Sequence, residues 1–76
     1  MSGAITVRAL ATLAGFAPPG GRLDIGPDDT VGRVAARLGL DLSLVGTVLL
    51  NDRPAEPGTR LAPGDTLVCI PPITGG

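Results

Sequence analysis

The sequence contains no lysine, histidine, tyrosine or tryptophan, and Phe16 is its only aromatic residue. It therefore offers no set of aromatic rings on which nucleic-acid bases would stack. The six arginines are balanced by seven acidic residues, so no basic field is available to attract phosphate. These absences argue against nucleic-acid binding.

Long apolar runs and metal-binding residues are also missing. No run approaches the roughly 18–20 apolar residues that span a bilayer, and residues 1–3 lack the pattern of a signal peptide. We therefore expect a cytoplasmic protein without a membrane partner. Cys69 is the only cysteine, which excludes an internal disulfide, and without histidine we expect no metal site and no bound cofactor.

The absence of lysine allows two interpretations. A chain without side-chain amines cannot acylate its own lysines, which would matter if one of its groups were activated as an acyl donor. Alternatively, it reflects a genomic preference for arginine.

What is present is the composition of one small folded domain. The chain has 76 residues, 43% of them hydrophobic, and a net charge of −1, values outside the range typical of disordered chains. A domain of this size has one small core and no room for a deep cleft, so we do not expect an enzyme.

Alternating apolar residues predict strands near both ends of the chain. Residues 5–13 carry apolar side chains at every second position: Ile5, Val7, Ala9, Ala11 and Leu13. The turn-forming segment 16–21 and a short alternation over residues 22–25 complete an expected hairpin. Residues 66–70 are expected to form the last strand, with Leu67 and Cys69 on one face and Val68 and Ile70 on the other. We expect Cys69 to be a buried small hydrophobe.

The middle of the chain has a helical period. Val31, Val34, Ala35 and Leu38 recur at the spacing of one helix face, with Thr30 as the expected N-cap and Gly39 as the C-terminal stop. Residues 47–50 read as a strand, 51–52 as a tight turn and 53–54 as an edge strand. The order predicts an α+β fold in which a mixed sheet of four to five strands packs on one main helix, the β-grasp or ubiquitin-like arrangement.

The C-terminal residues are the most informative. Pro71-Pro72 cannot donate to a sheet ladder, so residues 1–72 are expected to form the β-grasp domain and residues 73–76 a flexible Gly-Gly tail. The sequence from Cys69 to Gly76, preceded by residues 50–54 (LNDRP) and 63–65 (PGD), resembles the MoaD/ThiS family of ubiquitin-like sulfur carriers. The ending PPITGG is closer to MoaD, the small subunit of molybdopterin synthase.

The resemblance implies that Gly76 carries the sulfur. An adenylyltransferase of the ubiquitin-activating type (MoeB/ThiF-like) would use ATP to adenylate its carboxylate, and sulfur transfer would give a thiocarboxylate. The preceding residues would enter the partner's active site: Pro71, Pro72, Ile73, Thr74 and Gly75. Glycines suit a narrow channel because they lack Cβ atoms. This chain would contribute no catalytic side chain.

The resemblance favours the large subunit of molybdopterin synthase as the sulfur acceptor, in molybdopterin or tungstopterin synthesis. Thiazole synthase, in thiamine synthesis, is the next pathway. Two other classes remain open: a ubiquitin-like modifier joined through Gly76 to lysines of target proteins, and an interaction module whose tail does no chemistry.

A partner enzyme also needs a surface to bind. We expect Leu10, Val68 and Ile70 to form an exposed apolar patch near the exit of the tail, although isolated surface hydrophobes are also common. Members of the MoaD/ThiS family often have bulky aromatics in the last strand and phenylalanine at the position of Leu10. That departure bears on which partner is recognised.

Overall fold

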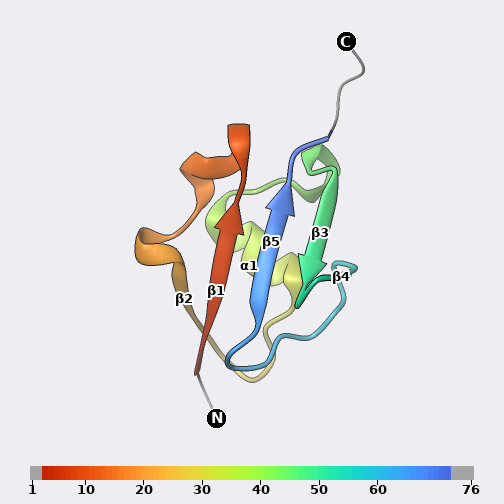
Figure 1. The fold of residues 1–76 in the computed structure, drawn as a ribbon. Coiled ribbons are helices and arrows are strands. Elements are labelled where there is room, and N and C mark those ends of the chain that lie inside the picture. The colour runs from red at the N-terminus through yellow and green to blue at the C-terminus, as the bar shows by residue number, and fades with distance from the viewer. Residues whose placement is uncertain (1–2, 73–76) are drawn as a thin grey trace.

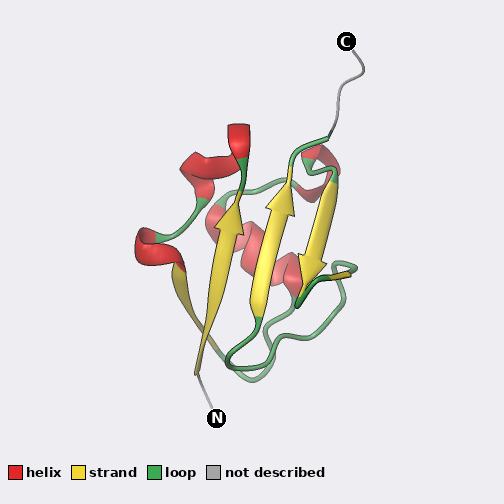
Figure 2. Ribbon diagram, viewed as in Figure 1, coloured by secondary structure: helices red, strands yellow, loops and turns green. Residues whose placement is uncertain are grey.

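The computed structural model of the chain describes residues 3–72. It contains a five-stranded sheet in the order β2-β1-β5-β3-β4, with helix α1 across one face (Figures 1 and 2). The elements are β1 (Gly3–Ala9), β2 (Arg22–Ile25), α1 (Val31–Leu38), β3 (Thr47–Leu50), β4 (Arg53–Pro54) and β5 (Thr66–Ile70). β1 and β5 are parallel and the other neighbouring strands antiparallel, so the predicted mixed sheet and β-grasp fold are confirmed.

The bounds of α1 follow from its capping residues. The Thr30 hydroxyl oxygen accepts a hydrogen bond from the Arg33 N–H at 3.2 Å, which satisfies one free donor of the first turn. Gly39 ends the helix with φ 77°, a left-handed conformation that glycine adopts without steric cost. The helix buries Val31, Val34 and Ala35 against the sheet. Both predicted caps are therefore confirmed.

The hairpin between β3 and β4 also follows its sequence signal. Asn51 and Asp52 have φ angles of 52° and 69°, the left-handed pair that matches the twist of a two-residue hairpin. Pro54 lies in β4 at the edge of the sheet, where its missing N–H leaves no ladder bond unmade.

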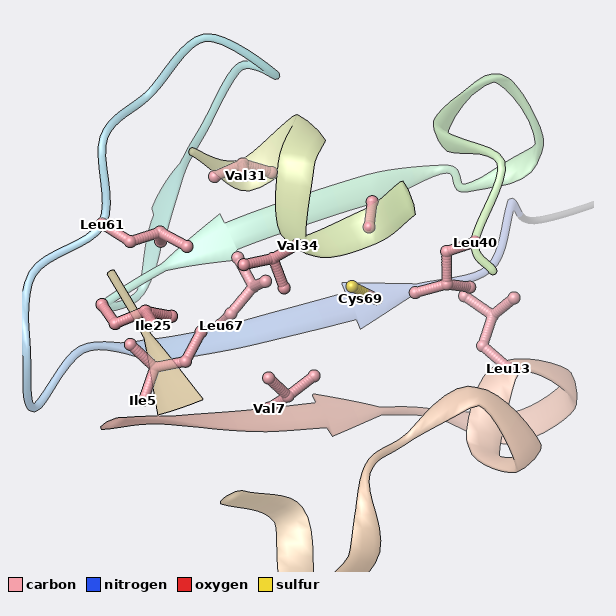
Figure 3. Packing of buried hydrophobic residues seen from close by; sticks show 11 residues of the cluster. Ile5, Val7, Leu13, Ile25, Val31, Val34, Leu40, Leu61, Leu67 and Cys69 are labelled. Atoms are coloured by element: carbon pink, nitrogen blue, oxygen red, sulfur yellow. The ribbon is translucent and has the colours of Figure 1, made fainter. Parts of the chain in front are cut away.

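The prediction that one strand covers residues 5–13 was wrong at its C-terminal end. β1 ends at Ala9, and Ala11–Phe16 forms a 3₁₀ helix, η1. Ala11 is exposed and has φ 50°, which turns the chain away from the strand direction. Leu13 is still buried, and its side chain lies near that of Leu40 at the end of the core (Figure 3). A strand and a 3₁₀ turn can thus bury the same apolar residue, which alternation alone does not distinguish.

The core lies between the inner face of the sheet and α1, and β5 runs through its centre (Figure 3). Leu67 and Cys69 of β5 are each 1% exposed. The fully buried hydrophobic residues are Ile5, Val7, Leu13, Ile25, Val31, Val34, Ala35, Leu40, Leu61, Leu67 and Cys69. No polar or charged side chain among residues 3–72 is buried. The inner face is thus filled by the core, and the opposite face of the sheet carries no helix (Figure 2).

Candidate functional site

β5 ends where the sequence predicts, and both neighbouring segments hold its last residues. The Leu10 N–H donates to the Cys69 carbonyl oxygen at 3.0 Å, and the Gly46 N–H donates to the Ile70 carbonyl oxygen at 2.9 Å. Pro71 and Pro72 have no N–H with which to continue the ladder. The chain therefore leaves the sheet between β1 and β3.

The predicted site residues divide into two groups. Pro71 is half-buried and Pro72 is exposed, and both lie within the part of the chain that the structure describes. Ile73, Thr74, Gly75 and Gly76 fall outside the described residues, so their predicted roles remain predictions.

The three predicted patch residues lie at one end of the sheet. Val68 and Ile70 are half-buried on the face of β5 opposite the core, and Leu10 is 38% exposed directly after β1. Because Leu10 bonds to the carbonyl of Cys69, its backbone lies beside the end of β5. In the β3–β5 register, Val68 pairs with Leu49, which places a fourth apolar residue on the same face. Leu10, Leu49, Val68 and Ile70 are called the outer patch below.

Leu49 was missed in the sequence because residues 47–50 are all Thr, Val or Leu, so their composition does not reveal which face is outward. Only the pairing with β5 decides it, since Val48 and Leu50 pair with the buried Cys69 and Leu67. The only sequence signal that could have placed Leu49 on the outer face was the expected outward position of its partner, Val68.

Two further exposed apolar side chains lie near the point where the chain leaves the sheet. Phe16, at the end of η1, is 42% exposed, and Leu44, in the 3₁₀ helix η3 (Leu42–Leu44), is 68% exposed. η1 follows β1 and η3 precedes β3, so both lie at the end of the sheet where β5 finishes (Figure 1). Residues 10–17, 41–46 and 70–72 are called the exit end below.

The exit end carries one charge, the carboxylate of Asp41. Its Oδ1 accepts hydrogen bonds from the Ser43 hydroxyl at 2.6 Å and the Ser43 N–H at 2.9 Å. The hydroxyl bond, followed by the backbone bond, lowers the pKa of Asp41 below its usual value, so this group stays ionised at neutral pH. The carboxylate caps η3 and leaves the rest of the exit end uncharged.

Cys69 is buried, as predicted, and is therefore a poor candidate for a second sulfur site. Burial raises the pKa of its thiol, which disfavours the thiolate that reacts with electrophiles. It fills space in the core beside α1 (Figure 3).

The described part of the chain contains no pocket in which a substrate or cofactor would be enclosed. Among residues 3–72, no three side chains of the metal-binding types come together. No helix within these residues has the length and hydropathy needed to cross a membrane.

No family model matches the sequence, and a search of curated proteins gave no match. Among solved structures, the chain is similar to SAMP1 from Haloferax volcanii, with 31% identity over 97% of this chain and 100% of that one, and a TM-score of 0.71. A second structure, small archaeal modifier protein 1 of H. volcanii, shows 28% identity over 93% of this chain and 99% of that one, with a TM-score of 0.73. The H. volcanii HVO 2177 protein, 24% identical over 99% of this chain and 88% of that one, has a TM-score of 0.71 and supports the fold alone.

Proposed function

This chain belongs to the family of ubiquitin-like small archaeal modifier proteins, and we propose that it carries sulfur as a thiocarboxylate on Gly76. The observation that carries the proposal is the way β5 ends. This central strand delivers Pro71-Pro72 out of the sheet at an end of the molecule with one charge, Asp41, and two residues separate Pro72 from Gly75-Gly76.

The proposed chemistry needs no catalytic side chain from this protein. A carboxylate oxygen of Gly76 attacks the α-phosphorus of ATP in the partner's active site, and pyrophosphate leaves. The resulting acyl-adenylate is an activated electrophile, which splits one difficult substitution into two easier ones. Hydrosulfide supplied by a sulfur donor attacks the carbonyl carbon, the bond to AMP breaks, a proton is lost, and the terminal group becomes a thiocarboxylate. We place this ATP-dependent cycle in the cytoplasm.

The length of the tail limits where the activating enzyme binds. Four extended residues span at most about 14 Å, so an active site that reaches Gly76 lies within that distance of Pro72. The enzyme surface around its channel must therefore face the exit end. The outer patch and Leu44 offer apolar side chains there, and apolar anchors surrounded by weaker contacts supply most of the affinity of such interfaces.

For the acceptor, we propose the large subunit of a molybdopterin or tungstopterin synthase, because the ending PPITGG resembles MoaD. Thiazole synthase in thiamine synthesis is the alternative within the same chemistry. The pathway depends on which enzyme accepts the tail, and Gly76 has the same role in both.

A second function is favoured by the similarity to small archaeal modifier proteins. In that case the adenylated Gly76 is attacked by a lysine amine of a target protein, AMP leaves, and an amide bond forms. The activating step and the surfaces it needs are shared by both functions, so they differ only in the final nucleophile.

The activating step is tested by ATP–pyrophosphate exchange with the host's ubiquitin-activating-type enzyme. We expect the chain to stimulate exchange and a variant lacking Gly75 and Gly76 to give none. Gly58→Ala is a matched control, because Gly58 lies outside the exit end and a Cβ there would meet nothing within 4 Å. Exchange that does not depend on the terminal glycines would contradict the proposal.

The two functions are separated by two readouts after activation with a radiolabelled sulfur donor in host lysate. Sulfur carriage predicts label in a small molecule. Modification predicts amide adducts of the chain with larger proteins, which carry no label, are detected by their mass and survive thiol reductants.

A further inference from the structure

Gly46 lies between η3 and β3, where the chain is exposed and makes a close backbone contact with Pro71 and Pro72. A Cβ at this position would lie 2.5 Å from Pro72 Cα, 2.7 Å from Pro72 N and 3.0 Å from the carbonyl carbon of Pro71. Ordinary separations between such carbon atoms are about 3.5–4.0 Å. No side chain fits between this backbone and the two prolines as they stand.

The need for glycine at this position is steric. The described glycines with positive φ are Gly20, Gly21, Gly39 and Gly64, and Gly46 is not among them. Its backbone conformation is therefore open to alanine, and close approach alone excludes a Cβ. The atoms that it approaches belong to the backbone and cannot move aside as the tip of a flexible side chain would.

Gly46 also makes the last hydrogen bond between β3 and β5. Its N–H donates to the Ile70 carbonyl oxygen at 2.9 Å, and residue 47 pairs with Ile70 in the register. The next residues, Pro71 and Pro72, have no N–H, so no backbone hydrogen bond that they donate fixes their direction. Their close contact with Gly46 limits that direction instead.

We propose that Gly46 is a positioning residue for the reaction at Gly76: it sets the direction in which Pro71-Pro72 leave the sheet. This inference rests on the proposed function. An added Cβ would push the two prolines away by about 1 Å to restore ordinary contact distances. Gly76 follows Pro72 by four residues, so the direction of the prolines sets where the terminal carboxylate starts its approach to the enzyme. A remote substitution that misplaces reacting groups by about 1 Å can cost up to on the order of 100-fold in rate.

Gly46→Ala tests the proposal with the activating enzyme and ATP. We expect kcat for adenylation to fall by on the order of 100-fold, while KM changes by less than about 3-fold because the outer patch is unaltered. Gly58→Ala, at a turn outside the exit end, should match the wild type, since a Cβ at that position meets nothing within 4 Å. A Gly46→Ala variant as active as this control would overturn the proposal.

A destabilised fold would lower activity for a different reason, so thermal unfolding is measured on the wild type, Gly46→Ala and Gly58→Ala. Positioning predicts that Gly46→Ala unfolds within a few degrees of the control. A fall in activity that tracks a large fall in unfolding temperature, with KM raised and kcat kept, would contradict it.

The contact itself is tested without any partner. In nuclear Overhauser spectra of the wild type, we expect a cross-peak between the α-protons of Gly46 and Pro72, and its loss in Gly46→Ala. If the wild-type chain is not activated but the cross-peak is present, the proposed function fails while the geometry holds. Absence of the cross-peak in the wild type would overturn the inference whatever the activity.

A double-mutant cycle with Pro72→Gly completes the test. If Gly46 acts through Pro72, the Pro72→Gly substitution already removes the fixed backbone direction at residue 72. Gly46→Ala then has little left to change there. The loss caused by Gly46→Ala should then be at least about 10-fold smaller in the Pro72→Gly background than in the wild type. Equal losses in the two backgrounds would show that Gly46 acts elsewhere.

Discussion

The two ends of the sheet use their surface side chains differently. At the end opposite the exit, where β3 finishes and β5 begins, polar side chains bond to one another and to the backbone. The Asp65 carboxylate accepts hydrogen bonds from the Ala62 N–H at 2.8 Å and from the Asn51 side-chain amide at 2.9 Å. The side-chain Oδ1 of Asn51 accepts from the Thr66 N–H at 2.9 Å. These residues are called the turn end below.

The exit end has few such bonds. Its one charge, the Asp41 carboxylate, accepts hydrogen bonds from Ser43. Leu10, Phe16 and Leu44 are exposed and lie outside the core. Polar residues at the turn end thus hold loops in place, and the exit end exposes apolar side chains to solvent. Under the proposed function, substitutions at the turn end should change stability, and substitutions of exposed apolar residues at the exit end should change partner binding.

The largest expected effect is that of a charge in the outer patch. Ile70→Asp should weaken binding of the activating enzyme by about 2–4 kcal/mol, roughly 30- to 1,000-fold, because an apolar anchor is replaced by an unpaired carboxylate. Isothermal calorimetry measures this. Thr6→Asp is the matched control, since Thr6 is exposed on the same face and pairs with Thr66 at the start of β5. Equal loss in both variants would remove the distinction between the two ends.

The reverse case is Asp65→Ala at the turn end. It removes the acceptor for the Ala62 N–H and for the Asn51 amide, so we expect the free energy of unfolding to fall by about 1–2 kcal/mol. Urea denaturation gives the change in stability, and pyrophosphate exchange at a temperature where the variant is folded should match the wild type. A fall in exchange at that temperature would place functional residues at the turn end as well.

A smaller effect is expected from Cys69 at alkaline pH. Because burial raises the pKa of this thiol, the unfolded chain, with a thiol pKa of about 8.5, releases the proton first. Its contribution to stability is therefore complete below about pH 8.5 and is lost as the pH rises through the folded pKa. No tyrosine or lysine titrates in this range. Urea denaturation from pH 7 to 10 should show the loss for the wild type and not for Cys69→Ala.

Much of the fold was predictable because its signals are local. The helical period of Val31 and Val34 is bounded by Thr30 and Gly39, and all four residues act as the pattern predicts. The strands β2, β3 and β5 likewise match the expected residues 22–25, 47–50 and 66–70.

What could not be predicted depends on contacts between distant segments. The predicted C-terminal end of β1 was wrong because the apolar alternation continues to Leu13, whereas the chain has already left the strand at Ala11. The outward position of Leu49 is fixed by its partner Val68, and the need for glycine at residue 46 by Pro72. No periodicity in the sequence encodes these pairings.

The smallest expected effect concerns the missing amines. If the absence of lysine protects an activated terminus, Arg8→Lys and Arg60→Lys should each give a minor fraction of self-conjugate under activating conditions, seen by intact mass. Both arginines are exposed, and lysine at either site keeps the charge. The wild type should give none from its side chains. Lysine variants without any self-conjugate would favour the genomic explanation.

The central claim is that the reactive group is the Gly76 carboxylate. Its most direct test is the intact mass of the wild-type chain after incubation with the host's activating enzyme, ATP and a sulfur donor. We expect the mass to rise by the difference between one sulfur and one oxygen atom, with fragmentation placing that difference on Gly76. An unchanged mass, or sulfur located on Cys69, would contradict the account.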